Sequence, residues 1–89
     1  MLTWILTATL ITTDITGYSK TYIYKTDSPK KEICIKEAQD AWFNVINDED
    51  LDHYQFTTIC EGEEKKRIMR YKVLCSPYKN SQRCITQTA

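Results

Sequence analysis

The chain has 89 residues, and its twelve Lys and Arg balance its twelve Asp and Glu, so the formal net charge is zero. This length accommodates one domain with a modest core and excludes two. The zero net charge argues against a protein that binds DNA or RNA through bulk charge. No run of about 20 apolar residues occurs, so no transmembrane helix is predicted. A hydrophobic content of 42% argues against disorder throughout the chain.

Residues 2–13 alternate between apolar and threonine-rich positions. One face carries Leu2, Trp4, Leu6, Ala8 and Leu10, and the other carries threonines with Ile5 and Ile11. A period of two predicts a half-buried strand. The segment also lacks the basic start and the cleavage site of an export signal. The residues from Asp14 to Gly17 form a turn signal, and residues 18–26 are predicted to be a second strand that completes an antiparallel hairpin.

A helix is predicted next, over residues 29–47. Ser28 is a good N-cap, and Pro29 is tolerated in the first turn. The apolar stripe that should face the sheet consists of Cys34, Ala38, Ala41 and Val45, widened by Ile35, Trp42 and Ile46. The acidic residues 48–52 lie at the unfavourable end of the helix dipole, so they should form a loop.

Two further strands are expected at residues 54–61 and 67–75, joined by a turn from Gly62 to Lys66. Pro77 should prevent continuation of the last strand. The order β-β-α-β-β predicts an α+β fold, an antiparallel four-stranded sheet with one helix packed across one face. Residues 1–75 are expected to form the single domain, and residues 76–89 a polar, irregular C-terminal tail.

The four cysteines at positions 34, 60, 75 and 84 allow two disulfides in any of three pairings. No C-x-x-C pair occurs, so neither a zinc ribbon nor a thioredoxin-like site is predicted. Cys34, Cys60 and Cys75 can alternatively be free thiols in the core. Cys84 carries most of the case for disulfides, because a free thiol in the polar tail would be exposed.

The sequence indicates no catalytic, cofactor-binding or metal site, which favours a protein that is not an enzyme but leaves an enzyme as an open alternative. The one histidine, His53, has no nucleophile motif beside it, and no glycine-rich phosphate loop occurs. The acidic residues 48–52 lack the glycine and the distal glutamate of a calcium loop. A solvated loop is the better interpretation of this segment.

Three groups of residues are candidates for contact with a partner. Phe43 is predicted to lie opposite the apolar stripe of the helix. Tyr22 and Tyr24 share one face of the second strand: they are core residues if that face meets the helix, and an exposed aromatic stripe if it does not. The sheet face that carries Ile5, Ile11 and Ile59 has no predicted cover, so oligomerisation or a partner is expected there.

Arg70 and Lys72 point outward from the fourth strand, beside a turn rich in Lys and Arg. Such charges protect a strand edge or form a solvated face, and they also suit an acidic partner. Tyr71 should face the other way, so a nucleic-acid motif of interleaved aromatic and basic residues is not predicted. The acidic segment 48–52 and the basic segment 65–72 are also complementary, which allows self-association.

These features favour a small protein-binding module that docks on a larger protein or on itself. Ile, Lys and Tyr are abundant, which is typical of AT-rich genomes, and a viral or phage accessory protein that inhibits or modulates a host protein is the leading hypothesis. One alternative is a secreted or periplasmic structural domain held by two disulfides. Another is a small enzyme or ligand binder with its site at a subunit interface. The location, host cytoplasm or extracytoplasmic, stays open.

Overall fold

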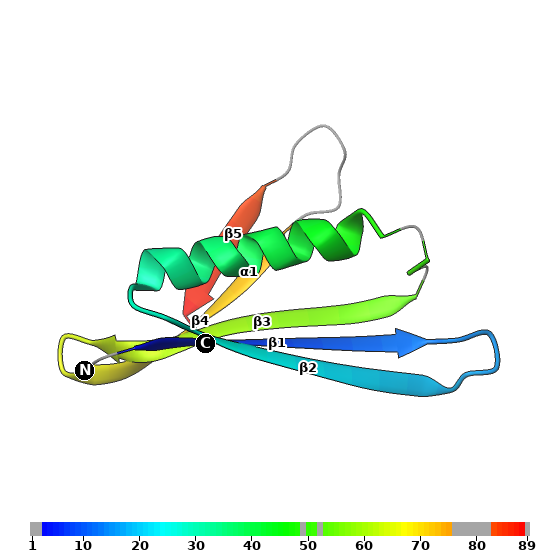
Figure 1. The fold of residues 1–89 in the computed structure, drawn as a ribbon, viewed down its shortest axis with the longest axis horizontal. Helices are drawn as coiled ribbons and strands as arrows, with labels where there is room; N and C mark the ends of the chain where they lie inside the picture. The colour runs from blue at the N-terminus through cyan, green and yellow to red at the C-terminus, as the bar shows by residue number, and fades with distance from the viewer. Residues whose placement is uncertain (1–2, 49, 52, 76–82, 89) are drawn as a thin grey trace.

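A computed structural model describes residues 3–48, 50–51, 53–75 and 83–88. Five antiparallel strands form one sheet, and a single helix crosses one face of it (Figure 1). In chain order the elements are β1 (Trp4–Thr13), β2 (Ser19–Ser28), α1 (Lys31–Ile46), β3 (Tyr54–Glu64), β4 (Arg67–Cys75) and β5 (Cys84–Thr88). The predicted α+β class is therefore confirmed.

The strand order is β2-β1-β3-β4-β5, so β2 and β5 are the edges of the sheet. The prediction of four strands was wrong by one, because residues 84–88, expected to be irregular, form β5. Cys84 lies directly opposite Cys75 across the β4–β5 pair and forms a disulfide with it. This crosslink holds a polar segment, which has little apolar area to bury, against the sheet. The predicted tail residues 76–82 and 89 lie outside the described part of the chain.

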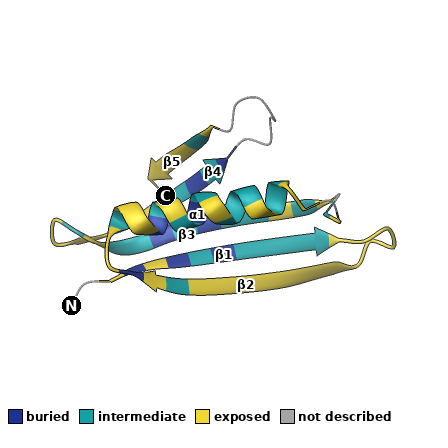
Figure 2. Cartoon of the chain, turned by 45° about the horizontal axis from the view of Figure 1, so that its top comes forward, coloured by how far each residue is buried: buried dark blue, intermediate teal, exposed yellow. Residues whose placement is uncertain are grey.

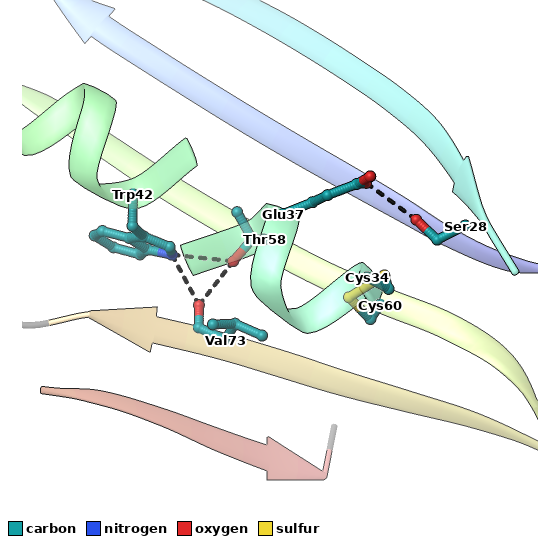
Figure 3. The surroundings of a disulfide bond; sticks show 7 residues. All are labelled: Ser28, Cys34, Glu37, Trp42, Thr58, Cys60 and Val73. Atoms are coloured by element: carbon teal, nitrogen blue, oxygen red, sulfur yellow. Dashed lines mark hydrogen bonds between the residues drawn. A yellow bond between two sulfur atoms is a disulfide. The ribbon is translucent and has the colours of Figure 1, made fainter. Parts of the chain in front are cut away.

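The core lies between α1 and the face of the sheet formed by alternate residues of β1, β3 and β4. Its buried hydrophobic residues are Trp4, Leu6, Cys34, Ala38, Cys60, Val73 and Cys75. The predicted inward faces of these three strands are thus confirmed. One polar side chain, Thr58, is fully buried at the centre: its hydroxyl donates to the Val73 carbonyl (2.8 Å) and accepts from Trp42 Nε1 (3.0 Å), as Figure 3 shows.

The disulfide between Cys34 and Cys60 joins the first half of α1 to the centre of β3 (Figure 3). Both cysteines are completely buried. The alternative of free core thiols is therefore not what the structure shows, because all four cysteines form disulfides. Sequence alone left three pairings open. The register of the sheet places Cys75 opposite Cys84, and the packing of α1 on the sheet brings Cys34 to Cys60.

The start of the helix differs from the prediction. Ser28 is the last residue of β2, paired with Trp4 and buried, and its hydroxyl donates to Glu37 Oε2 (3.0 Å). The N-cap position belongs to Lys30, which makes no side-chain capping bond. Ser28 therefore attaches the edge strand to the helix and does not cap the first turn.

The two hairpin turns differ in the residues and backbone angles that form them. In the β1–β2 turn the Asp14 carboxylate accepts hydrogen bonds from the backbone N–H groups of Thr16 and Tyr18, and Gly17 has a φ of 87°, as predicted. In the β3–β4 turn Lys65 and Lys66 both have positive φ, as a two-residue hairpin turn requires. Gly62 was expected in this turn, but it lies within β3 beneath the Trp4 ring.

Candidate interaction surface

No element of the described residues covers the face of the sheet opposite α1, and we call this face the open face. Its apolar side chains come from all five strands: Ile23, Ile5, Ile11, Ile59, Ile68, Leu74 and Ile85. Ile23, Ile68 and Ile85 are each more than half exposed. The prediction that Ile5, Ile11 and Ile59 share a face of the sheet without a cover is confirmed, within the described residues, by this register.

One line of open-face residues crosses the whole sheet without a charge, and we call it the uncharged row. The strand register aligns Ile23 with Thr9, Thr9 with Thr57, and Leu74 with Ile85. The pairing of Thr58 with Val73 places Thr57 beside Leu74. The row thus contains two isoleucines at the edges, a leucine, and two threonines in the central strands. Apolar and small polar side chains in this arrangement are cheap to desolvate against a partner.

Outside this row, the open face carries charged residues as well as the remaining isoleucines. Arg70 Nε donates to Glu61 Oε2 at 2.8 Å, and both side chains are substantially exposed. Lys72 lies beside Ile59 on the same face. Tyr71 points to the opposite face, as expected. The pairing of Arg70 with Glu61 offsets part of the predicted basic surface.

Tyr22 and Tyr24 lie opposite Leu10 and Ala8 of β1, so they take the helix side of the sheet. They are nevertheless 48% and 62% exposed. Figure 2 shows the reason: α1 crosses the middle of the sheet and leaves most of β2 exposed. Neither alternative that the sequence left open, core residues or an exposed stripe on the face away from the helix, describes them fully. These tyrosines face the helix side of the sheet but do not join the core.

Phe43 was predicted to lie opposite the core face of the helix, and this placement was wrong. The side chain is half-buried and packs against the buried cluster together with Ile35, Trp42 and Ile46. The flank of α1 toward β2 instead carries Glu37, Asp40, Ala41 and Asn44, which line a shallow hollow with Tyr24. The apolar side of the helix is thus rotated from the predicted stripe toward Trp42 and Phe43.

A polar cluster that sequence reasoning missed joins the helix start to the β3–β4 hairpin. Tyr71 donates its hydroxyl proton to Glu64 Oε2 (2.6 Å), and Lys31 Nζ donates to Glu64 Oε1 (3.2 Å). The Lys31 ammonium also lies 4.9 Å from the centre of the Tyr71 ring. No local pattern reveals this cluster, because Lys31 and Glu64 are 33 residues apart.

These contacts shift the pKa of each member. The hydrogen bonds from Tyr71 and Lys31 lower the pKa of Glu64 below its ordinary value. The bond to Glu64 raises the pKa of Tyr71 and that of Lys31. The cluster is a set of partly exposed groups held in their usual charge states near neutral pH, which is typical of a structural contact and not of a proton-transfer site.

We expect the contribution of Glu64 to stability to disappear in acid. Because its pKa is lowered in the folded state, the contribution is present above the unfolded-state value near 4.5 and is lost as the pH falls through the folded-state value. For Tyr71 and Lys31 the sign is reversed, so their contribution is lost as the pH rises through their raised pKa values. Urea unfolding should therefore show Glu64→Gln less stable than wild type near neutral pH and equal to it well below pH 4.5. Glu63→Gln, a change at the exposed neighbour, is the control and should leave the stability near neutral pH close to that of wild type.

The described part of the acidic loop shows no group of side chains arranged as a metal site. Among the residues that the structure describes, no group of three or more His, Cys, Asp or Glu side chains is placed to hold a metal ion. Asp50 and His53 line an open hollow with Asp14, whose carboxylate already accepts hydrogen bonds within its own turn. The hydroxyl of Thr16 and the backbone N–H of Tyr18 lower the pKa of Asp14. Glu49 and Asp52, the other carboxylates of this loop, lie outside the described residues.

Comparison with known proteins adds no function. No family model, curated protein or solved structure that was compared with the chain matches it. Within the described residues, no helix has the length and apolar character needed to cross a membrane.

Proposed function

We propose that this protein is a non-enzymatic binding module whose open face docks on another protein. The observation that carries the proposal is the uncharged row, which crosses all five strands and which no described element covers. A sheet that packs a helix on one face normally solvates the other with polar residues. Here isoleucines that are 52% and 65% exposed stand at the two ends of the row. A partner with a largely uncharged, flat surface fits this pattern.

The two disulfides favour an oxidising compartment as the place where the module works. Disulfides persist in oxidising compartments and are rare where thioredoxin and glutathione keep thiols reduced. A domain of 89 residues has a small core, and crosslinks supply stability that the core does not. We therefore place the binding function outside the reducing cytoplasm. The hypothesis of a viral or phage accessory protein rests on residue usage alone and stays a prediction.

Affinity capture with matched baits tests the proposal. The test variant, Thr57→Lys with Ile85→Lys, puts two charges in the uncharged row at positions that are not fully buried. The control, Ile15→Lys, changes a fully exposed isoleucine in the β1–β2 turn. The wild-type and control baits should enrich the same protein from extracellular fluid of the source or its host, and the test bait should lose it. Enrichment that ignores the row charges would contradict the proposal.

The second candidate is a structural domain without a partner, and the two disulfides are the observation in its favour. Such a domain has no need for an uncharged open face. If the protein is such a domain, the wild-type bait and the folded test variant, Thr57→Lys with Ile85→Lys, should capture the same proteins. The same capture experiment therefore separates the two functions.

A further inference from the structure

The β2 edge of the sheet is long and uninterrupted. Its ten residues pair with β1 one to one, from Trp4 with Ser28 to Thr13 with Ser19, so no bulge interrupts the strand. The strand contains no Pro or Gly, and eight of its ten residues are exposed. Alternate backbone N–H and C=O groups of an antiparallel edge strand point away from the sheet and are free to pair with another strand.

The opposite edge does not share these properties. The strand β5 has only five residues and begins at Cys84, which is crosslinked to β4. Natural sheets keep exposed edge strands short or interrupt them with bulges, because long regular edges attract other strands. By this measure β2 is the edge suited to a second strand.

We propose that two copies of this chain pair through β2 in antiparallel orientation, with Ile23 opposite Ile23 of the second copy. A two-fold axis perpendicular to the sheet relates the copies and preserves the two faces, so each residue lies opposite one from the same face. The pairing uses the backbone edge and is independent of the proposed function of the open face.

Side-chain matching selects this register. On the helix side Tyr22 lies opposite Tyr24 of the second copy, and the reverse, which gives two cross-strand aromatic pairs. On the open face the Ile23 side chains meet. The two neighbouring symmetric registers each keep only one such pair. The register centred on Tyr24 sets Tyr24 opposite Tyr24 and Ile23 opposite Lys25, and the register centred on Tyr22 sets Tyr22 opposite Tyr22 and Ile23 opposite Thr21. Apolar and aromatic pairs across strands stabilise a sheet, and the first register has three of them.

The charges of β2 also suit this register. Lys20 lies opposite Thr26, Lys25 opposite Thr21, and Asp27 opposite Ser19, so no two like charges are directly opposed. Because the helix leaves Tyr22 and Tyr24 48% and 62% exposed, they are free to meet their counterparts without displacing it. The product is a ten-stranded sheet with both helices on one face, in which the two uncharged rows lie on the same side.

Sedimentation velocity of the full chain with its disulfides intact, at micromolar to millimolar concentrations, tests the pairing. Wild type should shift with concentration from 10.5 kDa to twice that mass and no further. Ile23→Lys places two lysines opposite each other and should weaken the dimer by about tenfold or more. Ile23→Glu should do the same, and an equal mixture of the two variants should restore the dimer, because opposite charges then meet at residue 23.

A control variant and three contrary results complete the test. Ile68→Lys, another exposed isoleucine of the open face far from β2, should leave the dimer unchanged. A wild-type chain that stays monomeric over the whole range overturns the proposal, as does an assembly that grows beyond two copies. A stronger homodimer for Ile23→Glu also overturns it, since that result places residue 23 opposite Lys25.

Discussion

Replacing Cys34 and Cys60 together by alanine is expected to lower the free energy of unfolding by about 2–5 kcal/mol. The bond closes a loop of 26 residues that includes most of α1 and the segment leading to β3. Without the bond the unfolded chain regains the entropy of that loop. Both side chains are completely buried, so the loss of their sulfurs also leaves space between helix and sheet. Urea unfolding monitored by circular dichroism measures the change.

The second disulfide is the matched control. Cys75→Ala with Cys84→Ala opens a loop of only 9 residues at the sheet edge. Loop entropy alone then predicts a loss smaller by about 1 kcal/mol. Wild type treated with reductant keeps the sulfur atoms, so comparing it with the alanine variants separates the crosslink from the packing. Equal losses for the two pairs would contradict the expectation that the longer loop makes the Cys34–Cys60 bond the more stabilising crosslink.

The elements of the fold that alternate or repeat locally were predictable. Trp4, Leu6 and Ala8 are buried on the predicted face of β1, and β4 spans Arg67–Cys75 as expected. Such patterns are reliable because side-chain direction in a strand alternates with every residue. Helix and strand types, and therefore the α+β class, follow from them.

Features that depend on contacts distant in sequence were not predictable. The strand β5 is mostly exposed, so its sequence carries no apolar alternation, and only pairing with β4 and the disulfide define it. Phe43 packs inward because the helix is rotated about its axis to bring Trp42 over Thr58, and the periodicity of the helix did not resolve that angle. A helical period sets the width of an apolar stripe more reliably than its centre.

Only part of the candidate surface was predictable, because part of it depends on contacts between residues that are distant in sequence. Ile5, Ile11 and Ile59 were assigned to an uncovered face from alternation alone. The uncharged row could not be predicted without the strand register, because its members come from five strands. The exposure of Tyr22 and Tyr24 could not be predicted without the position of the helix, which covers the central strands and leaves most of β2 exposed. Sequence therefore assigns residues to a face, whereas tertiary structure decides which neighbours they meet.

Gly62 is the position where adding one methyl group should cost most. A Cβ built there would lie 2.3 Å from Cδ2 of Trp4, and the next two ring carbons are at 2.6 and 2.7 Å. Trp4 is only 6% exposed and packs against Tyr71, so its ring has little room to move. We expect Gly62→Ala to lower the free energy of unfolding by about 1–3 kcal/mol through overpacking, measured by urea unfolding.

A double-mutant cycle with Trp4→Leu isolates the contact. When the large ring is absent, Gly62→Ala should cost nothing or stabilise the strand slightly, because alanine loses less backbone entropy than glycine. Gly17→Ala is the control: its φ of 87° disfavours alanine by about 1–2 kcal/mol, but no atom lies within 4 Å of the added carbon. Its cost should be the same with Trp4 or Leu. If the cost of Gly62→Ala is equally independent of Trp4, the ring is not what excludes a side chain at position 62, and the packing of β1 on β3 must be reconsidered.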